Sequence, residues 1–228
     1  MKEVCVVKYG GSFLIPKDEY EPEAILFLID LVKQFPSKHF IFVIGGGGLA
    51  RKLVASGANA VHKVLPENLT EYGYDELGIA ATRMNAKVVL DTMTEILGEK
   101  IVDQEICLDP DGPLSLAKRV RIAAGGRPGH TTDYDMMLLA KNAAAMTVCK
   151  ITDFQKVLNV APKEYEKEKE YEELSSLSWK EFQELVGEEY HSGGHYPLDP
   201  RAVVVGTEIA HKHNYFKLFI GKKESLPQ

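Results

Sequence analysis

The sequence predicts an α/β fold, a three-layer sandwich in which helices cover both faces of a mainly parallel central sheet. Two observations lead to this prediction. Apolar, β-branched strands alternate along the chain with stretches of helical periodicity, which is the pattern of repeated β-then-α units. The strands are apolar almost throughout, as strands buried on both faces of a sheet are. With 228 residues and 45% hydrophobic content, the chain can bury a full core.

The elements follow one another in a regular order. A first strand precedes Gly10, and apolar residues with a period of about 3.6 predict a helix over 22–34. An apolar strand over 40–44 runs into a helix that begins within the glycines at 45–48. The same periodicity predicts one long helix over 74–97, ended by Gly98. The remaining expected elements are strands at 106–108, 120–124, 146–151 and 217–221 and a helix at 132–144.

The last third of the chain contains two helix-start signals. Ser178 followed by Glu181 matches a capping box, in which each residue pairs with the other's backbone N–H. Asp199 and Pro200 match an N-cap and the first residue of a helix. Directly afterwards, the segment Ala202-Val203-Val204-Val205 favours a strand by propensity. The highly charged stretch at 163–176 indicates a solvated loop or helix face.

Three of the strands run directly into glycines. Such turns let the backbone approach a ligand closely, and their consecutive N–H groups form concave nests for anions. Lys8, Arg51 and Arg127 lie beside the three turns. A site that holds several phosphates at once is therefore expected, which suits a kinase acting on a phosphorylated substrate. The three segments are 4–12, 40–48 and 120–127.

Composition narrows the classes of function. The net charge of −6 does not favour a nucleic-acid or membrane-surface binder. There is no charged-then-apolar leader and no apolar run that could span a bilayer, so we expect a cytoplasmic protein. Cys5, Cys107 and Cys149 are widely spaced and odd in number, which indicates reduced thiols. The histidines show no spacing typical of metal ligands, and no metal site is expected.

Five motifs in order resemble the amino acid kinase superfamily, within it the archaeal-type uridylate (UMP) kinases. The most specific is Gly-Gly-Arg-Pro-Gly-His-Thr-Thr-Asp at 125–133. It is similar to the Gly-Gly-x-x-Pro-Gly-His-Thr-Thr-Asp motif of that branch. The other four are Lys-x-Gly-Gly-Ser at 8–12, Gly-Gly-Gly-x-x-Ala-Arg ending at Arg51, the segment 74–82, and Pro-Leu-Asp-Pro-Arg-Ala at 197–202.

The resemblance implies direct in-line phosphoryl transfer from ATP to UMP, without a covalent intermediate. It implies Lys8 and Asp133 as catalytic residues: Lys8 lies over the transferring group, and Asp133 organises Lys8. From the residues alone, Asp133 also fits the N-cap of the helix that starts there. Magnesium is expected to arrive with the nucleotide. The residues expected to bind ATP are Lys8, Gly10, Gly11, Ser12, Thr152, Phe154, Val157 and Leu158.

The acceptor site is expected on the other glycine turns. Arg51 would hold the UMP phosphate as a fork above the backbone amides of Gly46 and Gly47. Asp75 is similar to the family carboxylate that takes the ribose hydroxyls, although it also fits the N-cap of the long helix. The remaining residues expected to bind UMP are Gly125, Gly126, His130, Thr131 and Thr132.

One segment departs from the family pattern. After Thr152 the family usually reads Asn-x-Asp-Gly-Val-Tyr-x-x-Asp-Pro, whereas this chain has Gln155-Lys156 in place of Asp-Gly and Ala161 in place of the later Asp. The change removes a residue that tolerates positive φ and two carboxylate acceptors. The change favours one alternative to a UMP kinase, a nucleotide-binding homologue with impaired catalysis. A second alternative is a kinase of another small phosphate such as isopentenyl phosphate. Such kinases usually carry a His soon after the glycine run, where this chain has Leu49-Ala50-Arg51, which argues against it.

The resemblance also implies an organisation. We expect one domain over residues 1–228, with an acceptor-nucleotide lobe at about 1–145 and a donor-nucleotide lobe at about 146–228. The expected partners are small nucleotides, with a role in pyrimidine nucleotide biosynthesis. Similar proteins assemble as hexamers built as trimers of dimers, and the apolar helices at 22–34 and 74–97 would allow this.

Overall fold

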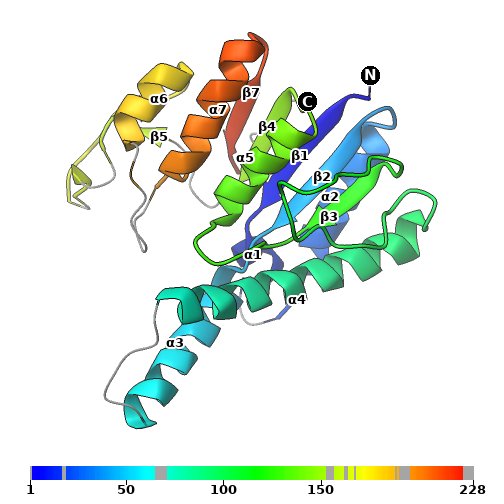
Figure 1. Cartoon of the computed structure of the whole chain (residues 1–228), viewed down its shortest axis with the longest axis horizontal. Coiled ribbons are helices and arrows are strands. Elements are labelled where there is room, and N and C mark those ends of the chain that lie inside the picture. Colours follow the sequence, from blue (N-terminus) through cyan, green and yellow to red (C-terminus); the bar gives the residue numbers. More distant parts are fainter. Residues whose placement is uncertain are drawn as a thin grey trace.

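A parallel sheet forms the centre of the molecule (Figure 1). The computed structural model describes residues 2–16, 19–64, 71–152, 157–161, 164–166, 168–187, 189 and 196–222. Within these residues the strand order is β3-β2-β1-β4-β7, and every neighbouring pair is parallel. The strands are β1 (Val4–Tyr9), β2 (His39–Ile44), β3 (Val120–Ala123), β4 (Thr147–Ile151) and β7 (Lys217–Gly221).

Helices cover both faces of this sheet, as Figure 1 shows. One face packs against α2 and α4 through alternate residues such as Val7 and Phe42. The other face packs against α5, α6 and α7 through the residues between them, such as Val6 and Val43. The predicted three-layer sandwich is therefore confirmed. The helices are α1 (Gly11–Leu14), α2 (Pro22–Gln34), α3 (Gly47–Val64), α4 (Glu71–Leu97), α5 (Thr132–Asn142), α6 (Trp179–Val186) and α7 (Pro200–Lys212).

Both helix-start signals in the last third are confirmed. Ser178 accepts from the N–H of Glu181 at 3.2 Å, and the Glu181 carboxylate accepts from the N–H of Ser178 at 2.7 Å. Asp199 caps α7 by accepting from the N–H of Arg201 at 2.9 Å, and Pro200 is the first helical residue. These caps set the positions of the two helices that pack on one another beside β7.

Two predicted strands are wrong. Residues 202–205 lie inside α7, because the Asp199 cap starts a helix there and Val203 and Val205 bury their side chains from it. Burial thus overrides the β-propensity of the valines. Residues 106–108 form only a single bridge pair, between Cys107 and Ala123, at the outer side of β3.

The charged stretch at 163–176 contains a short strand that sequence reasoning missed. In it, β6 (Glu173–Leu174) pairs antiparallel with β5 (Val157–Leu158). Only two residues from each strand take part, which is too short for an alternating pattern to be visible in the sequence.

All three cysteines are buried and unpaired with one another by a disulfide. Within the described ranges, no helix combines the length and apolar character that crossing a bilayer needs.

Candidate active site

Three glycine turns meet at the carboxyl edge of the sheet, because they end three neighbouring parallel strands. They are Gly10–Gly11 after β1, Gly45–Gly47 after β2, and Gly125–Gly126 beyond β3. The first two turns touch through their backbones. A Cβ on Gly11 would lie 2.3 Å from the oxygen of Gly45, and one on Gly47 would lie 2.2 Å from the carbonyl carbon of Gly11. Gly47 also has φ of +57°, which a side chain would strain.

Side chains from α4 hold the second of these turns. Asn85 is completely buried, and its amide nitrogen donates to the carbonyls of Gly45 at 2.9 Å and Gly46 at 3.3 Å. Its amide oxygen accepts from the hydroxyl of Tyr20 at 3.0 Å. The side chain of Asn85 therefore fixes the turn after β2, and both its amide nitrogen and its amide oxygen have hydrogen-bond partners.

The same helix holds the third turn. The hydroxyl of Thr82 accepts from the N–H of Gly125 at 2.8 Å. Arg83 donates to the carbonyls of Gly126 at 2.7 Å and Gly125 at 3.3 Å. One helix thus positions the backbones of two glycine turns. Thr82 ends the motif at 74–82, but the sequence predicted no role for it, and it pointed to neither Arg83 nor Asn85.

A cavity of about 310 Å³ opens between α3, α4 and the third turn. Five of the residues expected to bind UMP line it: Gly46, Asp75, Gly125, His130 and Thr132. Other members of that set lie differently. Arg51 is exposed on α3, and the Thr131 hydroxyl donates to Asp199 at 2.5 Å.

Lys8, Asp133 and Lys150 form an ion-pair network at the end of β1 and β4. Lys8 Nζ lies 2.7 Å from Asp133 Oδ1, and Lys150 Nζ donates to Asp133 Oδ2 at 2.7 Å. Asp133 comes from the first turn of α5, which packs on this face of the sheet. The resemblance implied the pairing of Asp133 with Lys8, whereas the sequence did not predict the second partner, Lys150. A single lysine within the apolar strand at 146–151 was the signal that could have found it.

Burial and charge act in opposite directions on the pKa values of this network. Burial alone would raise the pKa of Asp133, but the charges of Lys150 and Lys8 outweigh it and hold that pKa well below its ordinary value. Burial lowers the pKa of Lys150 to about 8, although Asp133 favours its charged form. Asp133 is therefore ionised throughout the physiological range.

Asp133 and Asp75 also fitted an N-cap by sequence, and neither has that role. Thr131 caps α5, since its hydroxyl accepts from the N–H of Tyr134 at 3.2 Å, and Asp133 lies within the first turn. The long helix begins at Glu71, so that Asp75 lies inside it. The carboxylate of Asp75 instead accepts from the N–H of Gly129 at 2.6 Å, which joins α4 to the loop before α5.

A second carboxylate of α5 holds the histidine of that loop. Nδ1 of His130 lies 2.8 Å from Asp135 Oδ1, and Asp135 Oδ2 accepts from the N–H of Gly126 at 3.1 Å. Burial raises the pKa of Asp135, against the hydrogen bonds from His130 and Gly126. Arg127 donates to His130 Nε2 at 3.2 Å and pairs with Asp111 at 2.9 Å. The ring of His130 is therefore fixed on both nitrogens at the wall of the cavity.

The start of α7 is joined to the same loop. Asp199 is buried and accepts from Thr131, while Arg201 donates to Asp199 Oδ2 at 2.8 Å and to the carbonyl of Gly129 at 2.6 Å. Arg201 lies in the motif at 197–202, which is similar to the family's Pro-Phe-Asp-Pro-x-Ala, at the position where that pattern specifies no residue. Nothing in the sequence therefore pointed to these contacts.

The residues expected to bind ATP are not all brought together. Lys8, Gly10, Gly11 and Ser12 lie at the end of β1, and the N–H of Gly10 donates to Ile151 at the end of β4 at 3.2 Å. Thr152 follows β4, and its N–H donates to Gly221 at 3.0 Å. Val157 and Leu158 form β5. Phe154 and the altered Gln155-Lys156 pair lie outside the described residues.

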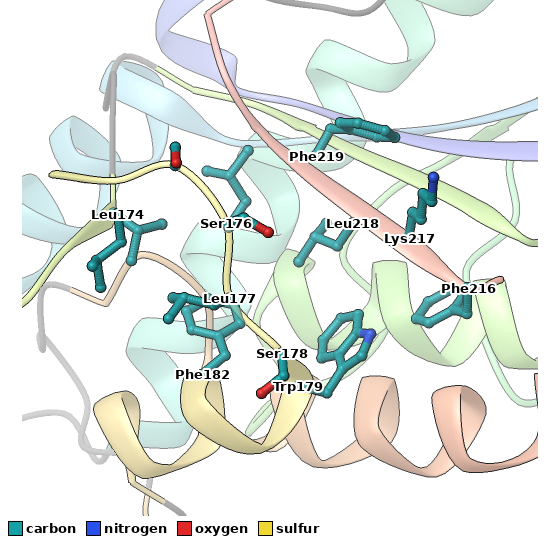
Figure 2. A pocket seen from close by; sticks show the side chains of 13 residues that line it. Leu174, Ser176, Leu177, Ser178, Trp179, Phe182, Phe216, Lys217, Leu218 and Phe219 are labelled. Carbon is teal, nitrogen blue, oxygen red and sulfur yellow. The ribbon is translucent and has the colours of Figure 1, made fainter. Parts of the chain in front are cut away.

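Val157 lines a second cavity, of about 560 Å³, away from the glycine turns. Figure 2 shows Trp179, Phe182 and Leu218 around it, in a space between α6 and β7. Apolar residues make up most of its lining, the polar members are Ser175, Ser176, Ser178 and Lys217, and no residue of the three glycine turns takes part. A phosphate site is therefore expected at the glycine turns and not here.

In the part of the chain that the structure describes, no group of three histidine, cysteine, aspartate or glutamate side chains could hold a metal ion. The chemistry available at the turns is that of backbone N–H groups and lysine ammonium groups. Both neutralise and position phosphate oxygens, which is most of what a protein contributes to phosphoryl transfer.

Comparison with known proteins gives several relatives. No family model matches the sequence. A uridylate kinase from Methanocaldococcus jannaschii is 28% identical over 173 residues, which are 75% of this chain and 72% of the relative. A uridylate kinase from Pyrococcus abyssi is 27% identical over 222 residues, which are 97% of this chain and 91% of the relative.

Solved structures agree with these sequence relatives. The crystal structure of a uridylate kinase from Archaeoglobus fulgidus matches with a TM-score of 0.71 at 25% identity, over 98% of this chain and 92% of that one. An aspartate kinase from Synechocystis matches with a TM-score of 0.65 at 16% identity, over 97% of this chain and 38% of that one, which shows the fold alone. The resemblance predicted from the five motifs and the amino acid kinase fold are both confirmed.

Proposed function

We propose that this homologue of the archaeal uridylate kinases is itself a UMP kinase, which transfers the γ-phosphoryl group of ATP to UMP and forms UDP. One observation carries the proposal. The Lys8–Asp133 ion pair lies at the end of β1, where the first glycine turn touches the second through the backbone. A lysine held between two anion-binding turns suits transfer between two bound phosphates.

On the acceptor side, UMP would occupy the 310 Å³ cavity. Its phosphate would face the turn of Gly46 and Gly47, within reach of Arg51 at the start of α3. Asp75 uses Oδ2 for the N–H of Gly129, which leaves its other oxygen to accept from a ribose hydroxyl. His130 and Thr132 also line this cavity.

On the donor side, ATP would place its phosphates on the turn of Gly10 and Gly11 and on the hydroxyl of Ser12. Lys8 would then contact the phosphoryl group as its bond to the leaving oxygen breaks and the bond to the UMP oxygen forms. Asp133 would act only by holding Lys8. We propose that Mg²⁺ arrives with the ATP and shares in neutralising its phosphates.

The proposal includes the setting of the enzyme. We place it in pyrimidine nucleotide biosynthesis in the cytoplasm and propose that it forms a hexamer, built as a trimer of dimers. Exposed apolar side chains on α4 support an assembly of this kind, since Met84 is 55% and Ile96 is 46% exposed. Light scattering of the purified protein measures the mass of the assembly directly.

A coupled assay with ATP and magnesium tests the function. We expect turnover with UMP and much slower turnover with CMP, AMP and isopentenyl phosphate. Lys8→Ala should abolish it, whereas Lys212→Ala, which removes an exposed lysine from the last turn of α7, should not. If no acceptor is turned over while UMP still raises the melting temperature, the chain binds the nucleotide without catalysis and the proposal is wrong.

A further inference from the structure

Lys150 is a charged residue in a place where the fold gives it no access to bulk water. It lies in the central part of the sheet, on β4 between β1 and β7, and only 4% of the residue is exposed. Its neighbours along the strand, Cys149 and Ile151, are buried as well. A buried ammonium group is costly unless it is paired, so its partners indicate what it does.

Those partners belong to the site. In the parallel register of β1 and β4, Lys150 is the direct neighbour of Lys8, so that both side chains point to the face covered by α5. Each takes a different oxygen of the Asp133 carboxylate, with Lys8 on Oδ1 and Lys150 on Oδ2. The carboxylate is therefore held at both ends and cannot rotate away from Lys8 without losing Lys150.

A third segment is attached to the same ammonium group. Lys150 Nζ donates to the carbonyl of Pro197 at 2.6 Å, two residues before the Asp199 cap of α7. Asp199 accepts from Thr131, the cap of α5. Lys150 thus joins β4, the start of α5 and the loop before α7 at one point.

We propose that Lys150 is a positioning residue of the phosphoryl-transfer site, which orients Asp133 so that Asp133 presents Lys8 to the phosphoryl group. The inference rests on the proposed kinase function. Lys150 also places a second positive charge beneath the transfer point, where the phosphates of both nucleotides meet. Because it is buried and bonded to protein groups, it acts through Asp133 and not by contact with the substrate.

This role predicts a dependence on pH. The charged groups around Lys150 are Lys8 from β1, Asp133 from α5 and Asp199 from the start of α7. Burial, assisted by Lys8, lowers the pKa of Lys150 to about 8, against the two carboxylates. As pH rises through this value, Lys150 loses its charge and Asp133 keeps a charged partner on one side only. Since kcat/KM reports ionisations of the free enzyme, kcat/KM for ATP should decline above about pH 8.

The test compares Lys150→Met with Lys212→Met, which removes an exposed lysine from the last turn of α7. We expect Lys150→Met to lower kcat about 10- to 100-fold, the range found when a residue that orients a functional group is removed. KM for UMP should stay within about twofold, because the acceptor cavity is untouched. The decline of kcat/KM for ATP above pH 8 should disappear in this variant and persist in the control.

Two results would overturn the proposal: a kcat of Lys150→Met within about twofold of the parent, or an alkaline decline that persists unchanged in it. If Lys150→Met does not fold, calorimetric binding of a non-hydrolysable ATP analogue to the parent protein replaces it. Affinity should then fall as pH rises through about 8, and an affinity independent of pH between 7 and 9.5 would refute the role. This binding measurement also judges Lys150 if the parent fails to phosphorylate UMP, a result that would refute only the proposed function.

Discussion

Asp133 keeps its charge in a buried place because two ammonium groups contact it. Its pKa is held well below the ordinary value by Lys150 and Lys8 despite burial. A depressed pKa means that the unfolded chain takes up a proton at higher pH than the folded one. The stability that Asp133 contributes is therefore complete above its unfolded pKa near 4 and is lost as pH falls below that value.

Asp133→Asn should lower the free energy of unfolding at pH 7 by about 3 to 5 kcal/mol, because it leaves Lys150 buried without a counter-charge. The gap between the parent and the variant should narrow as pH falls below about 4. Urea unfolding over a pH series measures both. A gap that stays constant down to pH 3 would show that the ion pairs do not stabilise the fold.

Gly47 is constrained by conformation and by space at once. Its φ of +57° and the backbone of Gly11 beside it exclude any Cβ. Gly47→Ala should lower the free energy of unfolding by more than about 1 kcal/mol and raise KM for UMP, because the turn must move away from Gly11. Gly98→Ala is the matched control: its φ is +85°, but nothing lies near the position of a Cβ, and it follows the end of α4 outside the site. An equal effect of both changes on KM would show that the close approach is unimportant.

At the scale of elements, α4 determines the geometry of the site although it carries no residue of the transfer network. Thr82 and Arg83 hold the third glycine turn, and Asn85 holds the second. α4 can make all these contacts because it passes the carboxyl ends of both β2 and β3.

Asn85→Ala should lower the free energy of unfolding by about 1 to 3 kcal/mol, because two glycine carbonyls and the hydroxyl of Tyr20 lose their partner. KM for UMP should rise about tenfold, as a displacement of the turn worth about 1.4 kcal/mol would give. Ser178→Ala is the control: the lost cap on α6 should cost about 1 kcal/mol and leave KM unchanged. Equal KM values in the two variants would mean that α4 contributes stability alone.

The sequence predicted most of the helices and strands and a smaller share of the side-chain contacts at the site. The helix at 22–34 and the glycine turns were found because their signals are local, namely periodicity and residues that end strands. The valines at 203–205 were wrongly predicted as a strand, because burial of the helix against the sheet outweighs their local preference for a strand. Lys150 was missed because its importance depends on the register of two strands, which no local pattern contains. The expected roles of the site residues remain predictions.

At the scale of the whole molecule, the described residues divide into two apolar cores, one on each face of the sheet. The acceptor cavity lies between helices and the edge of the sheet and does not cut through either core. A ligand that binds in this cavity binds the folded protein and not the unfolded chain, so that it raises the free energy of unfolding.

UMP at a hundred times its dissociation constant should raise the free energy of unfolding by about 2.7 kcal/mol. For a chain of this size, the melting temperature should rise by roughly 5 to 10 °C. Scanning fluorimetry with UMP, and with AMP at the same concentration as a control, measures this. Equal shifts with the two nucleotides would contradict a cavity selective for UMP, and no shift with UMP would contradict the acceptor site itself.

Because the site depends on the parallel pairing of β1 and β4, enzymatic activity can be used to test whether the protein is correctly folded. Lys8 and Lys150 share one face of the sheet only because their strands pair in one register. If β4 slipped by a single residue, its side chains would exchange faces and Lys150 would point into the opposite core. A molecule misassembled in this way would keep much of its secondary structure and yet lose the bond between Lys150 and Asp133. Specific activity therefore reports the fraction of a preparation whose strands are aligned, a property that circular dichroism does not measure.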